Sequence, residues 1–289
     1  MAVTVKSVPV PPEAAGMKAG LFLRRLLPDL PESVLRKIFA ARDVKLDGIR
    51  ISRDTLLQAG QTLTVYLPSS VREAEPLRIV YEDNDILLVN KPAGVSVEDD
   101  TPGSLSLSHL CRLHAGAEAF PPAACHRLDY KTSGLCLFAK NEKALSALEE
   151  VFRQRTVEKY YTCLVRGIPK PPAAVCSAFL LKDAEHGKVR VLDHEAPGAR
   201  SVVTGYETLE SGAVSRLKVH LITGRTHQIR AHLAALGHPV LGDDLYGDRA
   251  FNHLQKVRSL KLCATEIILH TGGALPDLDG KSFRIDPPF

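Results

Sequence analysis

The segment His126–Gly134 brings an acid, several bases and hydroxyl groups together within nine residues. It reads HRLDYKTSG and comes directly before the apolar run Leu135–Phe138. Loops at the ends of strands are where rigid scaffolds display reactive groups. Asp129 is the carboxylate of this segment, and a carboxylate can stabilise or capture positive charge that develops on a substrate. The alternative is an ordinary turn in which Asp129 caps a backbone amide.

A second segment, TGRTHQIR at 223–230, leads from a strand into a helix. Gly224 permits a backbone conformation closed to other residues, or the close approach of a ligand. Arg230 lies about 100° round the helix from the apolar Ile229. Because helical side chains lean towards the N-terminus, Arg230 should reach back over the turn. A half-buried guanidinium needs an anionic partner, which is either Asp129 or a phosphate; the alternative is a surface arginine paired with a nearby acid.

Two other chemistries fit the sequence poorly. His227 and His232 are five residues apart, so they face different sides of a helix, unlike the HExxH pattern of metal sites. Ser133 stands in TSG and not in GxSxG, so the signature of a Ser-His-Asp hydrolase is missing. The six cysteines form no CxxC pair, which argues against a zinc site or a disulfide framework. We therefore expect no metal site.

The elements that must position these groups are mainly strands. Strands are expected at residues 77–81, 86–90, 135–138, 160–165 and 216–222. Asn141 can cap a following helix, and another helix is expected over 226–236, where Gly237 ends it. Strands outnumber helices, without βαβα alternation and without GxGxxG. The pattern therefore predicts an α+β fold whose main body carries a mixed, mainly antiparallel sheet.

A small α/β module precedes this body. Residues 1–13 predict an irregular leader, because they are rich in Pro and Ala. Two helices are expected, from Met17 and over 32–42, followed by short strands at 44–46, 49–51 and 63–67. The polar stretch 68–76 is typical of a linker. We therefore predict two domains, 14–68 and 76–289.

The excess positive charge of the chain lies in the small module. Residues 14–66 hold nine basic and five acidic residues, a net charge of +4 that equals the net charge of all 289 residues. Arg36, Lys37 and Arg42 lie off the apolar face of the second helix, so they are available to a polyanion. The alternative is a solvated surface with a chance imbalance of charge.

Composition limits the class of protein. Of the residues, 45% are hydrophobic and 24% are charged, and no apolar run approaches the ~18–20 residues of a membrane span. The first 20 residues lack the apolar block of a signal peptide. We therefore predict a cytoplasmic protein with reduced thiols and no membrane partner.

Five stretches together resemble the RluA-type pseudouridine synthases, in the order and spacing of that family from about Leu77 to Phe289. They are IVYEDNDILLVNKPAGVSV (79–97), HRLDYKTSGLCLFAK (126–140), EKYYTCLVRG (158–167), LITGRTHQIRAHLAALGHPVLGDDLYG (221–247) and SLKLCATEIILH (259–270). Residues 14–66 are similar to the S-four-like RNA-binding domain that many members carry in front.

The resemblance implies an isomerase that acts on uridine within an RNA chain and needs no cofactor. It makes Asp129 the essential carboxylate, Arg230 its ion-pair partner and Tyr161 the aromatic that stacks on the target base. Arg127 would fill the gap left by the flipped nucleotide. The substrate-binding set that we predict from these stretches is His126, Arg127, Thr132, Leu221, Gly224, Arg225, His227 and Leu262. Cys263 stands where many members have His, which leaves a role at that position open.

The partner implied is structured RNA, with large-subunit ribosomal RNA first and transfer RNA second, bound by a monomer through Arg36, Lys37 and Arg42. Two rivals are retained. A non-catalytic RNA-binding or ribosome-assembly protein would keep the fold and lack the activity. A glycosidase-type hydrolase usually requires a second carboxylate, and none is evident beside HRLD.

Overall fold

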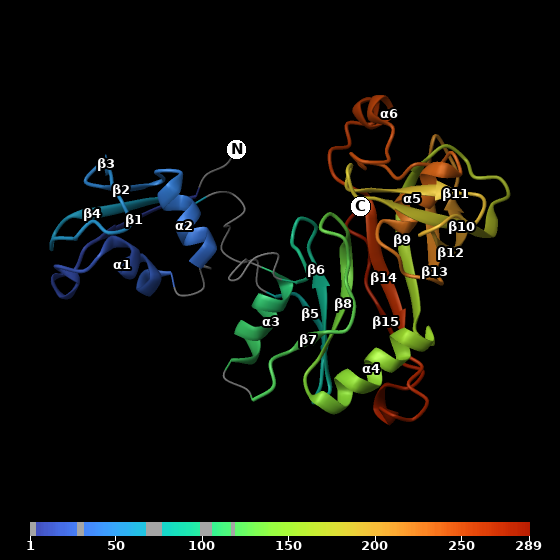
Figure 1. The fold of residues 1–289 in the computed structure, drawn as a ribbon, viewed down its shortest axis with the longest axis horizontal. Coiled ribbons are helices and arrows are strands. Elements are labelled where there is room, and N and C mark those ends of the chain that lie inside the picture. The colour runs from blue at the N-terminus through green and yellow to red at the C-terminus, as the bar shows by residue number, and fades with distance from the viewer. Residues whose placement is uncertain (1–3, 28–31, 68–76, 99–105, 117–118) are drawn as a thin grey trace. The chain divides into compact units, whose positions relative to one another are not determined.

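A computed structural model describes residues 4–27, 32–67, 77–98, 106–116 and 119–289. The chain divides into two compact units, one of residues 1–78 and 98–119 and the other of residues 79–97 and 120–289 (Figure 1). The linker predicted at 68–76, where the two predicted domains meet, lies outside the described residues. Within the described part of the chain, no helix has the length and apolar character to span a membrane.

The first unit contains a four-stranded antiparallel sheet and two helices that pack on it. The strand order is β1 (Thr4–Pro9), β4 (Thr62–Leu67), β2 (Val44–Leu46), β3 (Ile49–Arg50). The helices are α1 (Ala19–Leu26) and α2 (Glu32–Ala40), and the short η1 (Pro12–Ala14) and α3 (Leu107–Ala115) belong to the same unit.

The core of this unit follows the sequence periodicity. Leu63 and Val65 alternate along β4, and Leu23 and Ile38 come from the two helices; all four are fully buried in one cluster. The irregular leader was a wrong prediction for residues 4–9, because β1 pairs with β4 along their whole length. The edge of β4 needs hydrogen-bond partners, and the backbone N–H and C=O groups of an extended segment supply them without any need for an apolar pattern.

The second unit is an α+β body, as predicted, built on an 11-stranded, mainly antiparallel sheet. The strand order runs from β11 (Lys188–Leu192) through β10 (Ala173–Asp183), β12 (Arg200–Glu210), β13 (Val214–Leu221), β9 (Glu158–Arg166), β14 (Leu262–Ile268), β8 (Ser133–Ala139) and β6 (Ile86–Lys91) to β5 (Ile79–Glu82). β15 (Ser282–Arg284) pairs with β14, and β7 (Ala123–Ala124) pairs with β8. The remaining elements are α4 (Glu142–Gln154), α5 (Gln228–Ala235), α6 (Arg249–Leu254) and η3 (Pro276–Leu278).

A parallel contact in the middle of this sheet joins its two halves. β8 and β14 run side by side (Figure 1). They run in the same direction, with Gly134 opposite Ala264. Gly134 has φ +115°, and a Cβ atom there would lie 2.3 Å from the Ala264 carbonyl oxygen. The two strands can therefore approach this closely only because residue 134 is glycine.

The helix predicted at 226–236 begins later than expected. α5 starts at Gln228, since His227 adopts a left-handed backbone with φ +56°. The Gln228 Oε1 atom accepts hydrogen bonds from the Thr223 hydroxyl (2.9 Å) and from the Arg225 N–H (3.1 Å). These contacts hold the chain in a tight turn before the first helical residue.

Candidate active site

Asp129 lies in the loop between β7 and β8, and hydrogen bonds fix the backbone around it. The Asp129 carbonyl accepts from the Thr132 N–H at 3.0 Å. The Tyr130 carbonyl accepts from the Gly94 N–H at 2.7 Å and from the Lys91 Nζ at 3.3 Å. The Asp129 side chain is 24% exposed, so its carboxylate is reachable while its main chain is held from two sides.

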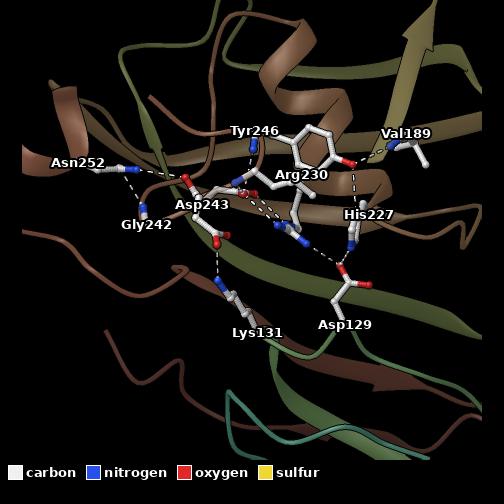
Figure 2. Close-up of polar contacts among 11 residues, drawn as sticks. Asp129, Lys131, Val189, His227, Arg230, Gly242, Asp243, Tyr246 and Asn252 are labelled. Atoms are coloured by element: carbon white, nitrogen blue, oxygen red, sulfur yellow. Dashed lines mark hydrogen bonds and ion pairs between the residues drawn. The ribbon is translucent and has the colours of Figure 1, made fainter. Parts of the chain in front are cut away.

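Arg230 projects from α5 towards Asp129 and is almost completely buried (Figure 2). Its Nη1 lies 3.4 Å from the Asp129 Oδ2. The same guanidinium binds Asp243 through two shorter contacts, Nε to Oδ2 at 2.7 Å and Nη2 to Oδ1 at 2.9 Å. The structure thus brings together the two residues that the sequence analysis singled out, and it adds a third charge.

Sequence reasoning missed Asp243, whose side chain is fully buried. Its Oδ1 also accepts from the N–H groups of Leu245 (2.8 Å) and Tyr246 (3.1 Å). Burial alone would raise the pKa of Asp243, but the contacts with Arg230 and these backbone N–H groups outweigh it and lower the pKa. Asp243 therefore stays ionised beside Arg230. The GDDLYG stretch was visible in the sequence, but nothing in it marked the first aspartate as the buried one.

The same interaction acts on the guanidinium. Burial alone would lower the pKa of Arg230, whereas the hydrogen bonds and charge of Asp243, followed by the charge of Asp129, raise it. The loop that carries Asp243 is held by Asn252 of α6, which accepts from the Gly242 N–H at 2.9 Å and donates to the Asp243 carbonyl at 3.3 Å (Figure 2). A permanent positive charge is thereby fixed next to Asp129.

His227 and Tyr246 close the site on a third side. The His227 Nε2 lies 4.0 Å from the Asp129 Oδ2, and its Nδ1 lies 3.0 Å from the Tyr246 hydroxyl. That hydroxyl accepts from the Val189 N–H at 2.9 Å, and the Tyr246 ring lies 5.3 Å from the Arg230 guanidinium carbon. Burial lowers the pKa of His227, which favours the neutral imidazole.

Tyr161 and its neighbours form an apolar wall on one face of the sheet. Tyr161 on β9 is opposite Val219 of β13 and Ala264 of β14. Residues two apart on a strand share a face, so Leu221 and Leu262 lie on the same face as Tyr161, and all three are buried. Burial, followed by the charge of Asp129, raises the pKa of the Tyr161 phenol, which keeps it uncharged.

The remaining residues of the predicted substrate-binding set differ in how exposed they are. Arg127, Gly224 and Arg225 are exposed. Thr132 is buried, and its hydroxyl has no hydrogen-bond partner within the part of the chain described. His126 has a structural environment: its Nε2 accepts from the Leu137 N–H at 3.1 Å, its ring stacks on Phe152, and desolvation lowers its pKa to about 4.

The RNA-docking residues predicted in the first unit are exposed. Arg36 and Lys37 lie on α2 off its buried side, and Arg42 follows the helix with φ +59°. Their side-chain position agrees with the helical periodicity, while their binding to RNA stays a prediction. As for metals, no group of three His, Cys, Asp or Glu side chains that could hold an ion occurs among the described residues.

The second unit is an α+β body that holds a carboxylate–guanidinium pair, and the apolar wall of Tyr161 lies in the same sheet. Comparisons with known proteins identify the family. Residues 85–235 match the family described as RNA pseudouridylate synthase. Ribosomal large subunit pseudouridine synthase C of Vibrio cholerae is 34% identical over 86% of this chain and 82% of that protein. An uncharacterized RNA pseudouridine synthase of Mycobacterium tuberculosis is 35% identical over 84% of this chain and 82% of that one.

Solved structures agree with the sequence comparison. Human RNA pseudouridylate synthase domain containing 4 matches with a TM-score of 0.61 and 27% identity, covering 75% of this chain and 91% of that one. Human RNA pseudouridylate synthase domain containing 1 matches with a TM-score of 0.60 and 28% identity, covering 75% of this chain and 84% of that one. The chain belongs to the RNA pseudouridylate synthase family. It is an RluA-type isomerase that acts on RNA, as the motif resemblance predicted.

Proposed function

We propose that this protein converts uridine to pseudouridine within large-subunit ribosomal RNA, with transfer RNA as the second candidate. The names of several similar proteins, including those of Vibrio cholerae and Vibrio vulnificus, specify the large ribosomal subunit. We further propose that it works as a monomer in the cytoplasm.

Asp129 is the group that carries the proposal. When the bond between the sugar C1′ and the uracil N1 breaks, positive charge develops at C1′, and a carboxylate can stabilise or capture it. The base then turns, a bond forms between C1′ and C5, and the proton on C5 is lost while N1 gains one. The observation that supports this role is the Asp129 carboxylate, partly exposed and 3.4 Å from a buried guanidinium. The two routes that use it are attack on the sugar carbon and removal of a sugar proton.

Tyr161 and Arg127 are proposed to handle the target nucleotide. A uridine stacked in RNA must be extruded before it can react, which costs a few kcal/mol. Stacking on an aromatic ring returns ~1–3 kcal/mol of that cost. Tyr161 is uncharged and lies on the same face as Leu262 and Leu221, so its ring suits the flat face of a base. Arg127 is exposed near Asp129 in sequence and would occupy the vacated position in the RNA.

The test is Asp129→Asn, measured as pseudouridine formed in transcripts of large-subunit ribosomal RNA and of transfer RNA. We expect a normally folded variant whose activity falls by several orders of magnitude, because an amide cannot replace the carboxylate. Asp244→Asn is the matched control: Asp244 is exposed and pairs with Lys131 at the surface, so that variant should keep its activity.

The outcomes separate the alternatives. Normal turnover by Asp129→Asn would remove the proposed mechanism. Release of free uracil by the wild-type protein would indicate a hydrolase instead. Modification of transfer RNA alone would show that transfer RNA, and not ribosomal RNA, is the substrate.

A further inference from the structure

Lys159 carries a charge that no described carboxylate pairs with. It lies on β9 two residues before Tyr161, so it projects from the same face of the sheet. Its Nζ makes no hydrogen bond or ion pair with any described residue and lies 5.7 Å from the centroid of the Phe152 ring. Desolvation by burial lowers the pKa of Lys159, and the charge of Arg155 lowers it further. Both influences disfavour the ammonium form.

The surroundings of this ammonium are positive or neutral. Arg155 ends α4 in a left-handed conformation and is exposed. The adjacent acid, Glu158, is one residue away along the strand, and its carboxylate is bound by the Tyr160 hydroxyl (2.6 Å) and by the His270 ring (2.9 Å). No carboxylate raises the pKa of Lys159 among the described residues.

Lys159 also lies beside the turn that leads to the active-site helix. A Cβ atom placed on Gly224 would be 3.5 Å from the Lys159 Nζ, so the ammonium borders the bare backbone of that turn. The ammonium therefore borders the turn that leads to α5.

Burying a charge without a partner is costly, and the cost is removed when a ligand provides the opposite charge. A lysine ammonium is a compact point charge suited to a phosphate oxygen. We propose that Lys159, with Arg155 beside it, binds a backbone phosphate of the RNA next to the nucleotide that stacks on Tyr161. This inference rests on the proposed function, because it takes the bound polyanion to be the substrate RNA.

The experiment compares the wild-type protein with Lys159→Met, Lys159→Arg and the control Lys143→Met, which removes an exposed charge from α4. The affinity for a large-subunit ribosomal RNA transcript is measured as a function of salt, together with the melting temperature. Lys159→Met should weaken binding roughly tenfold and reduce the slope of log K against log salt by about 0.7–0.9. Its melting temperature should rise, because the substitution removes a partly buried charge that has no counter-charge. Lys159→Arg should keep the wild-type slope, and Lys143→Met should change neither quantity.

A structural role for Lys159 predicts the opposite combination, a lower melting temperature with an unchanged salt slope, and that result overturns the proposal. If Lys159→Met does not fold, Arg155→Gln should itself reduce the slope, and an unchanged slope in that exposed variant overturns the proposal as well. The binding readout is separate from catalysis. Failure of the wild-type protein to modify the transcript would count against the proposed function, while the slopes would still decide the role of Lys159.

Discussion

At the scale of single residues, the guanidinium of Arg230 is shared unequally between two carboxylates. Asp243 takes two contacts of 2.7 and 2.9 Å, and Asp129 takes one of 3.4 Å. A bidentate pair with a buried carboxylate fixes the plane of the guanidinium. The weaker contact leaves most of the acceptor capacity of Asp129 for a substrate. Asp243 is in this sense a positioning residue, which acts on Asp129 through Arg230.

We expect Asp243→Asn to lower both stability and activity. The substitution leaves the buried Arg230 without its main counter-charge, and removing one partner of a buried ion pair costs about 3–5 kcal/mol. Urea unfolding should show that loss, whereas the exposed Asp244→Asn should show almost none. Asp243→Glu keeps the charge and should recover part of the activity. If Asp243→Asn unfolds at the same urea concentration as the wild-type protein, the ion pair with Arg230 does not contribute to stability.

Lys91 predicts a particular dependence of stability on pH. It is fully buried, and its Nζ donates to the carbonyls of Pro92 (3.1 Å), Val95 (2.7 Å) and Tyr130 (3.3 Å). Burial lowers the pKa of Lys91 from 10.5 to about 8. Between these two pH values the unfolded chain binds the extra proton, so the contribution of Lys91 to the free energy of unfolding rises with pH. Over the whole window the rise is about 3 kcal/mol.

Comparison of the wild-type protein with Lys91→Met isolates this contribution, because all other groups titrate in both proteins. The difference in the free energy of unfolding, wild type minus variant, should increase from pH 7 to pH 10 in urea titrations. A difference that stays constant with pH would show that Lys91 has an ordinary pKa in the folded protein.

At the scale of elements, the parallel contact of β8 and β14 aligns the loop of Asp129 with the centre of the sheet. We expect Gly134→Ala to destabilise the protein by a few kcal/mol, since the new methyl group would meet the Ala264 backbone at a φ of +115°. Gly205→Ala is a suitable control, because its Cβ atom would lie 3.4 Å from the His220 Cβ at an ordinary φ. Equal melting temperatures for the two variants would contradict the close approach.

The sequence predicted the helices and strands that are marked by nearby residues, such as a helix cap or an alternation of apolar and polar side chains. Asn141 was expected to cap a helix, and its side chain accepts from the Ala144 N–H at 2.8 Å at the start of α4. The alternation in 216–222 predicted β13, where Leu217 and Val219 are fully buried. By contrast, β1 depends on pairing with β4, more than 50 residues later. Residues 4–9 carry no periodic pattern from which this pairing could be predicted.

The candidate site shows the same limit. Helix geometry left the partner of Arg230 open between Asp129 and a phosphate, and the family resemblance implied Asp129. The two side chains do lie in contact. Asp243 and Asp244 are identical neighbours in the sequence, yet one is fully buried against Arg230 and the other is 62% exposed beside Lys131. Only the path of the chain around Gly242 decides between them, and a loop has no repeat from which that path could be predicted.

At the scale of the whole molecule, the uneven charge of the chain predicts how RNA affinity depends on salt. The entire net charge of +4 lies in residues 14–66, so this part should bind phosphates while the other unit carries the carboxylate chemistry. Each phosphate that a cation neutralises releases counterions, which contributes about 0.7–0.9 to the slope of log K against log salt.

We therefore expect the double substitution Arg36→Gln and Lys37→Gln to reduce the salt slope by roughly 1.4–1.8 and to weaken binding most at low salt. Turnover at saturating RNA should stay at the wild-type value, because Asp129, Arg230 and Asp243 all belong to the other unit. The matched control, Lys256→Gln with Arg258→Gln, removes the same charge from exposed positions of that unit and should change the slope less. Equal slopes for the two double variants would indicate that the affinity for RNA depends only on the total charge of the protein. A loss of turnover at saturation would place the two residues of α2 in catalysis and not in docking.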